Sequence, residues 1–273
     1  MAKGIHTEQT FEAAIETALL EKGGYVQGKS DDFDVQLGIF PSYVIQFLQN
    51  SQPKEWNKIE AIHKADVGQK VVQRLLKEID LRGTLDVLRN GFTDYGVKFK
   101  MAFFMPETGL NPEAEELYKT NHLSVTRQLF YERNGRNSLD MVLSLNGLPI
   151  ATIELKNQFS GQDIQNAKKQ YVYDRDPSEP IFQFKKRSLV HFAVDADECY
   201  MTTKLDGKNT RYLPFNVGFQ NGAGNPPNKN GYKTSYLWEY VWTRDSFLDI
   251  ISKFLHLSVE GYEFDGVKKK KEK

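Results

Sequence analysis

The chain has 273 residues, of which 40% are hydrophobic, 12% aromatic and 26% charged, a composition that excludes disordered and collagen-like proteins. Its 36 basic and 36 acidic residues give zero net charge, so a polyanionic partner would have to be met by a local basic patch. The single cysteine, Cys199, excludes an intramolecular disulfide framework and a multi-cysteine zinc site, and favours a reducing, cytoplasmic setting. No stretch approaches the ~20 apolar residues that span a bilayer, so we expect no membrane partner.

The first third of the sequence predicts a helix followed by an irregular region. Phe11, Ile15 and Leu19 recur at helical spacing, and Gly23-Gly24 ends the run, which predicts an amphipathic helix over 7–22. Between 30 and 121 the pattern is irregular, with a helical stretch at 67–79 and a strand-like one at 99–104. We interpret 30–121 as a helical insertion into a core that contains a sheet.

The rest of the sequence predicts a sheet flanked by helices. Apolar runs at 123–129, 139–145 and 148–156 are separated by Asn134-Gly135 and Asn146-Gly147, which predicts three strands joined by hairpin turns. The later elements that we expect are a helix at 164–173, a strand at 189–194, a strand at 199–203 paired with 211–213, a loop at 216–233 and a helix at 238–257. The expected fold is α/β, with a mixed sheet between helices.

The chain ends on a lysine-rich run, for which two readings remain open. Residues 268–273 carry no structural stop signal and suggest a solvated tail. The alternative is a linker to a further domain. We take residues 1–260 as one domain and 261–273 as the tail.

The best candidates for catalysis lie on the expected strands at 139–145 and 148–156. Asp140 and Glu154 offer hard oxygen ligands for Mg²⁺, and Lys156 faces the same side as Glu154 because side chains two apart on a strand share a face. Such a group suits phosphodiester hydrolysis, with the lysine orienting water or offsetting charge. The alternative is a Glu-Lys pair on a solvent face, and Asp206-Gly207-Lys208 shows that such triplets also arise elsewhere in this chain.

A shared metal constrains the register of this hairpin. If Asn146-Gly147 were a plain two-residue turn, Asp140 would lie opposite Ile153, and the two acids would face opposite sides of the sheet. We therefore predict a bulged, three-residue connection over 146–148 with Gly147 at positive φ, which brings Asp140 opposite Glu154.

Further candidates lie on two helices. The helix at 164–173 carries Lys168, Lys169, Gln170 and Tyr173, which fit phosphate contact and base stacking, although an ordinary solvated helix face explains them as well. Glu8 or Glu12 could supply a third carboxylate, against the simpler role of acids at a helix start. We interpret His191, on a buried strand, as a core residue and not as a ligand.

These residues carry a family resemblance. The run from Asn137 to Asn157, with Asp140, Glu154-Leu155-Lys156 and the turn phrase Asn146-Gly-Leu-Pro149, resembles the nuclease motif of the PD-(D/E)xK superfamily. More closely, it is similar to the amino-terminal domain of the R subunit of type I restriction enzymes. The segments at 7–25, 173–177, 200–203 and 211–216 resemble the same domain, so the likeness spans most of the chain.

The resemblance implies a Mg²⁺-dependent endonuclease that cuts double-stranded DNA, with Asp140 and Glu154 as metal ligands and Lys156 as the catalytic lysine. The family's Gln-x-x-x-Tyr motif has its nearest match one residue short, at Gln170-Tyr-Val-Tyr173. The resemblance also implies partners, namely specificity and methyltransferase subunits, and ATP-driven motor domains that this chain is too short to contain. The lysine-rich end would then lead to that motor.

Two other functions remain open from the sequence. The same fold could act as a docking or DNA-clamping module with negligible cleavage of its own. The second possibility is a nuclease-like phosphodiesterase that acts on RNA or on single strands.

Overall fold

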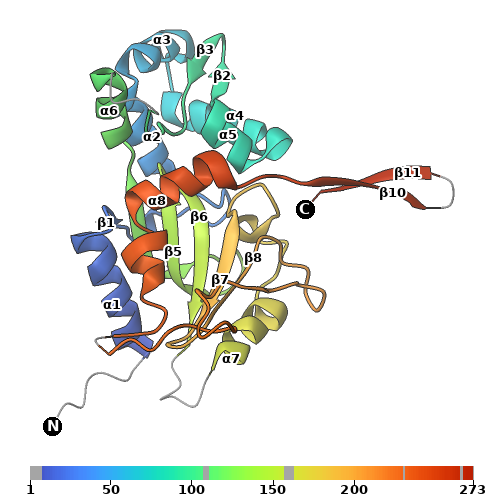
Figure 1. Cartoon of the computed structure of the whole chain (residues 1–273). Helices are drawn as coiled ribbons and strands as arrows, with labels where there is room; N and C mark the ends of the chain where they lie inside the picture. Colours follow the sequence, from blue (N-terminus) through green and yellow to red (C-terminus); the bar gives the residue numbers. More distant parts are fainter. Residues whose placement is uncertain (1–7, 107–110, 157–162, 230, 265–266, 273) are drawn as a thin grey trace.

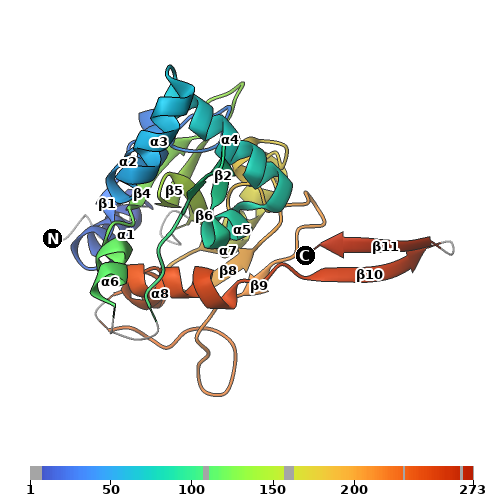
Figure 2. The same cartoon turned by 90° about the horizontal axis from the view of Figure 1, so that it is seen from above.

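A seven-stranded mixed sheet with helices on both faces forms the centre of the computed structural model, which describes residues 8–106, 111–156, 163–229, 231–264 and 267–272 (Figures 1 and 2). Its strand order is β1-β4-β5-β6-β7-β8-β9, with β1/β4 and β6/β7 parallel and the other neighbours antiparallel. The strands are β1 (Val26–Gln27), β4 (Leu123–Phe130), β5 (Ser138–Leu145), β6 (Leu148–Leu155), β7 (Val190–Val194), β8 (Cys199–Thr202) and β9 (Leu213–Pro214). The α/β fold expected from the sequence is therefore present.

The two central strands are covered on both faces. Every residue of β6 is buried, and so is every residue of β5 except Ser138, which explains their nearly continuous apolar sequences. One hydrophobic cluster joins the sheet to α1 (Glu8–Glu21) through Phe11, Ile15 and Leu19 and to the C-terminal helices. These are η5 (Leu237–Val241), α8 (Arg244–Asp249) and η6 (Ile250–Phe254). The helix expected at 238–257 is thus broken near Trp242.

A second cluster packs the segment after β6 against the sheet. It joins Leu129, Leu139 and Val142 to Tyr171 and Phe182. The helix expected at 164–173 consists of α7 (Ile164–Lys169) and a π-helical turn, η3 (Gln170–Asp174), and the short helix η4 (Pro180–Phe182) follows. A π-helical turn is rare and often marks a functional site.

The described residues of the 30–121 region form a largely helical layer at the end of the sheet where β5 turns into β6 (Figure 1). Phe40 N donates to Gly147 O of that turn, and Asn146 Nδ2 donates to Met101 O. The prediction of a strand at 99–104 is wrong, because β3 (Val97–Phe99), the strand that reaches this segment, ends at Phe99. The elements are η1 (Ser30–Asp32), α2 (Pro41–Ser51), α3 (Pro53–His63), α4 (Val67–Arg82), α5 (Thr84–Asn90), β2 (Phe92–Asp94), β3 (Val97–Phe99) and α6 (Pro112–Lys119).

The hairpin β5–β6 contains a bulge, but not where we expected it. Leu145 pairs with Leu148 across a two-residue turn in which Asn146 and Gly147 both have positive φ, so the three-residue connection is wrong. The register shifts further along the hairpin. Ser144 pairs with Pro149 and Leu143 with Ala151, so Ile150 is the extra residue of the bulge. Past the bulge Met141 pairs with Ile153, a register that brings Asp140 opposite Glu154.

The lysine-rich end, for which we expected a solvated tail or a linker, is part of a β-hairpin. Its backbone forms strand β11 (Val267–Glu272), paired antiparallel with β10 (Val259–Phe264) in a hairpin that extends away from the sheet (Figure 1). The division at residue 260 and the linker role of this segment stay predictions.

Candidate active site

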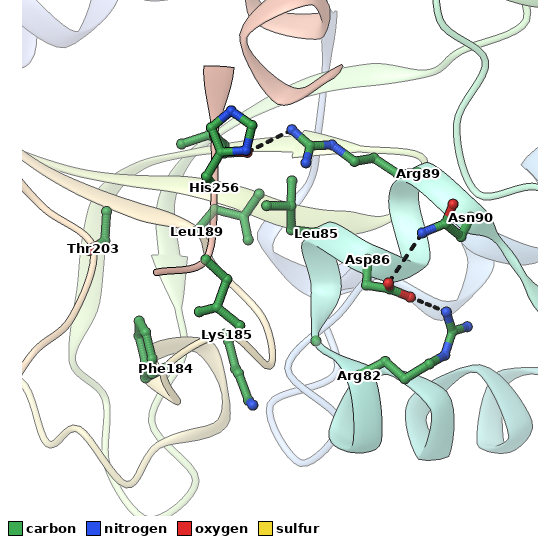
Figure 3. A pocket seen from close by; sticks show the side chains of 13 residues that line it. Arg82, Leu85, Asp86, Arg89, Asn90, Phe184, Lys185, Leu189, Thr203 and His256 are labelled. Carbon is green, nitrogen blue, oxygen red and sulfur yellow. Dashed lines mark hydrogen bonds and ion pairs between the residues drawn. The ribbon is translucent and has the colours of Figure 1, made fainter. Parts of the chain in front are cut away.

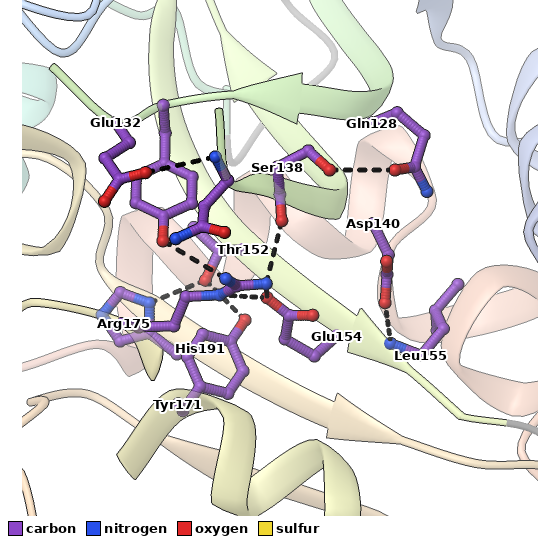
Figure 4. Close-up of polar contacts among 12 residues, drawn as sticks. Gln128, Glu132, Ser138, Asp140, Thr152, Glu154, Leu155, Tyr171, Arg175 and His191 are labelled. Carbon is purple, nitrogen blue, oxygen red and sulfur yellow. Dashed lines mark hydrogen bonds and ion pairs between the residues drawn. The ribbon is translucent and has the colours of Figure 1, made fainter. Parts of the chain in front are cut away.

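Asp140 and Glu154 lie on adjacent strands, and both are buried (Figure 4). Asp140 is 9% exposed, and its Oδ2 accepts a 2.7 Å hydrogen bond from the backbone N–H of Leu155. Glu154 is fully buried. The charge of Asp140 is among the causes that raise the pKa of Glu154, so the two carboxyl groups interact. The bulge at Ile150 is the feature that places them together.

Lys156 completes the triplet at the end of β6. Its Nζ lies 3.8 Å from Asp140 Oδ2 and donates a 2.9 Å hydrogen bond to the carbonyl of Leu155. Lys156 is only 7% exposed. A buried ammonium group costs free energy unless a carboxylate compensates it, and Asp140 is that carboxylate. This geometry contradicts the reading of Glu154 and Lys156 as a solvent-face pair.

Arg175, which the sequence reasoning did not select, is the main partner of Glu154. Its Nε and Nη2 both lie 2.8 Å from Glu154 Oε1, and Nη2 also donates to the carbonyl of Ser138. Glu154 Oε2 has no hydrogen-bond partner in the described part of the chain. Burial is the largest cause that raises the pKa of Glu154 above its ordinary value, and the ion pair with Arg175 opposes that rise.

Glu12 is the third carboxylate near this group. It is 2% exposed on α1, its Oε2 accepts from Arg127 Nε at 3.1 Å, and its Oε1 accepts from Gln128 Nε2 at 2.8 Å. Burial raises the pKa of Glu12, and the charge of Asp140 raises it further. The side chain of Glu8 lies outside the described residues.

Gln128 has an unusual backbone for a strand residue. Its φ is 48°, in the left-handed region, and it occupies the place in β4 between the pairs Arg127–Met141 and Leu129–Leu139, which is opposite Asp140. Its side chain connects Glu12 to Ser138, whose Oγ donates to Gln128 Oε1 at 3.0 Å. A strained residue beside buried acids is typical of a functional site.

The residues predicted on the helix after β6 divide into two groups. Tyr173 is 65% exposed and Lys169 is also exposed, so both are accessible to a ligand. Lys168 is half-buried, with its Nζ 3.8 Å from the ring centre of Tyr200, which makes it part of a cation–π contact. Gln170 lies in the π-helical turn with its Oε1 buried and unpartnered among the described residues.

A hydrogen-bonded row of polar groups lies beside Glu154 (Figure 4). Thr152 Oγ1 lies 2.8 Å from the Tyr171 hydroxyl and 2.7 Å from His191 Nδ1. Burial lowers the pKa of His191 to about 3, so this imidazole is neutral at pH 7. The expectation of a core histidine is confirmed by this contact and by its 1% exposure.

The donor set fits a divalent cation in part. Glu154 Oε2 is a buried carboxylate oxygen that no described residue contacts by a hydrogen bond, and Asp140 lies opposite it on β5. Both side chains are hard oxygen donors of the kind that Mg²⁺ prefers. In the described residues, however, no three or more His, Cys, Asp or Glu side chains converge as a ready metal cluster. Since Mg²⁺ usually keeps several waters and binds one or two carboxylates, two protein donors are compatible with it.

A separate cavity of about 360 Å³ lies away from these acids (Figure 3). It is enclosed by α5, the segment at 184–189 and the residues after η6. Its arginines are occupied, because Arg82 pairs with Glu78 and Arg89 donates to the carbonyls of Ile251 and Leu255. We assign no role in the candidate active site to this cavity.

Comparison with models of protein families identifies the family of this chain. A family model described as type I restriction enzyme R protein N terminus matches residues 45–210, which include Asp140, Glu154, Lys156 and Arg175. A search of curated proteins finds no significant match. In the described part of the chain, no helix has both the length and the apolar character needed to cross a membrane.

Proposed function

Because the chain belongs to the family of type I restriction enzyme R protein N termini, we propose that it is the DNA-cleaving module of such an enzyme. The reaction would be Mg²⁺-dependent hydrolysis of phosphodiester bonds in double-stranded DNA. The observation that carries this proposal is the burial of Asp140 and Glu154 opposite each other on β5 and β6, with the buried Lys156 Nζ 3.8 Å from Asp140.

Asp140 and Glu154 would hold the metal, with Glu12 as the nearest further carboxylate. A bound Mg²⁺ would polarise the phosphate and lower the pKa of a coordinated water. Arg175 takes Glu154 Oε1 and leaves Oε2 for the cation, while the N–H of Leu155 fixes the Asp140 carboxyl group. Lys156, 3.8 Å from Asp140, would stabilise negative charge on the phosphate.

The helix after β6 would contact the DNA. Lys169 and Tyr173 are exposed there and would reach a phosphate and a sugar or base. Lys168, held by its contact with the Tyr200 ring, would add positive charge beside the DNA. Gln170, whose buried Oε1 has no hydrogen-bond partner among the described residues, would be a further residue of the active site. The partners of the assembled enzyme would be the specificity and methyltransferase subunits, with ATP needed only by motor domains outside this chain. Cleavage would take place in the cytoplasm.

One observation favours the second candidate, a docking or DNA-clamping module with negligible cleavage of its own. The described acids do not converge as three metal ligands, and Arg175 already neutralises Glu154. In this alternative the buried charges would only stabilise the fold.

Metal binding distinguishes the two candidates. Calorimetric titration of the chain with Mn²⁺, as a stand-in for Mg²⁺, should give one site that Asp140→Asn weakens at least about tenfold. Asp206→Asn is the matched control, because Asp206 belongs to the exposed lookalike triplet. Equal Mn²⁺ affinities in the two variants would favour the clamping module.

A further inference from the structure

A second cleft lies in the helical region 30–121, far from the candidate active site. It has a volume of about 830 Å³ and opens between the end of α3, one face of α4 and the β2–β3 turn. The β5–β6 turn lies under this region, and Asp140 is six residues along β5 from that turn, or roughly 20 Å at strand spacing. A ligand in this cleft therefore cannot touch the active-site carboxylates.

Three of the residues that line the cleft are cations from α4. Lys70, Arg74 and Lys77 recur at i, i+4 and i+7, so they share one face of the helix. Arg74 donates to the carbonyl of Thr93 and pairs with Glu78, and Lys70 donates to the carbonyl of His63. Lys77 is exposed and has no hydrogen-bond or ion-pair partner in the described residues.

The acid that lines the cleft is already paired. Asp94 Oδ2 lies 2.7 Å from His63 Nε2, and both side chains are nearly buried. Asp94 Oδ2 therefore already has a hydrogen-bond partner before any ligand arrives. What remains for a ligand is a positive surface with few apolar atoms, which suits an anion better than an apolar peptide.

Tyr95 stands at the edge of the cleft in an unfavourable conformation. Its φ is 44° in the two-residue turn between β2 and β3, where Asn or Gly is preferred, and the side chain is 75% exposed. Its ring meets His63 edge to face, with centroids 5.3 Å apart. Packing does not require an exposed, strained aromatic residue, so its position points to a ligand.

We propose that this cleft binds single-stranded nucleic acid, with phosphates on Lys70, Arg74 and Lys77 and one base stacked on Tyr95. Cations that follow the backbone beside an aromatic platform are the combination used for unpaired strands. A base within a duplex would not offer its face to Tyr95, so the preference should be for single strands. The helical region would then hold an unwound strand while chemistry takes place elsewhere.

The test is fluorescence anisotropy of a labelled oligothymidylate in EDTA, with a duplex of the same length as the second probe. Lys70→Glu/Lys77→Glu should weaken binding of the single strand at least about tenfold. Lys22→Glu/Lys229→Glu makes the same change in net charge at two exposed lysines outside the cleft and should stay within about twofold of the native protein. Circular dichroism checks that each variant is folded.

Tyr95→Gly separates stacking from charge, because it removes the ring and relieves the positive φ. It should weaken single-strand binding about fivefold or more and change duplex binding little. Equal losses in the two charge-reversal variants, or no effect of Tyr95→Gly, would overturn the proposal. Binding in EDTA does not depend on metal or cleavage, so the result of this test is independent of whether the proposed nuclease activity is present.

Discussion

Arg175 directs two N–H groups at one carboxylate oxygen of Glu154, and the other oxygen has no hydrogen-bond partner among the residues that the structure describes. The pair is almost fully shielded from solvent, with 4% and 0% of the two side chains exposed. A buried ion pair with this geometry positions a carboxyl group more than it stabilises the fold, because desolvation offsets most of the attraction.

Removal of Arg175 alone should therefore be costly. We expect Arg175→Met to lower the free energy of unfolding by about 3 kcal/mol, since Glu154 would stay buried without its partner. The double variant Arg175→Met/Glu154→Met should recover most of that loss. Urea denaturation measures the free energy of unfolding of both variants. The control is Arg133→Met, which removes the half-exposed partner of Glu179 and should lower the free energy of unfolding by about 1 kcal/mol. Additive losses in the double variant would contradict a direct coupling.

Replacement of Gly147, in the turn of the β5–β6 hairpin, should be costly. Its φ is 84°, and an added Cβ would lie 2.6 Å from Val44 N and 2.7 Å from Phe40 O, which are backbone atoms that cannot easily move. Gly207→Ala is the control, because Gly207 also has positive φ but faces open space. We expect Gly207→Ala to cost about 1 kcal/mol and Gly147→Ala about 1–3 kcal/mol more, as measured by urea denaturation. Similar losses of stability at both positions would show that the backbone of Phe40 and Val44 can move to make room for a Cβ at position 147.

The sequence was informative where the pattern is local and repetitive. It predicted α1, the strand triplet and the buried His191, because apolar spacing and turn residues act over a few positions. The location of the bulge was missed, although Pro149 was a signal: a proline inside a central strand lacks a ladder donor and fits only where the ladder is disrupted.

The partners of the acids were harder to foresee. Arg175 comes 21 residues after Glu154 and Arg127 comes 115 residues after Glu12, as the sequence separations of their hydrogen bonds show. Such pairs depend on how helices dock on the sheet, which no local pattern encodes. A weak signal existed in β4, where Arg127 and Gln128 interrupt an apolar strand.

His191 should make the fold sensitive to acid. Its pKa falls from about 6.5 in the unfolded chain to about 3 in the folded one, so its contribution to stability is complete above pH 6.5 and is lost as the pH falls towards 3. Between pH 7 and pH 5 the loss should be about 2 kcal/mol. His191→Gln, which cannot titrate, should show a correspondingly smaller change in urea stability over that interval. An unchanged pH dependence in His191→Gln would contradict a buried, neutral imidazole.

The central claim is that the group around Lys156 cleaves DNA, and plasmid cleavage tests it most directly. The assembled restriction enzyme, with the full-length R subunit, should cut duplex plasmid in Mg²⁺ and ATP, and Lys156→Ala should reduce that rate at least about 100-fold. Lys208→Ala, in the exposed lookalike triplet, should cut at the native rate, and both variants should keep native ATPase activity. Cleavage at the native rate by Lys156→Ala would contradict the account.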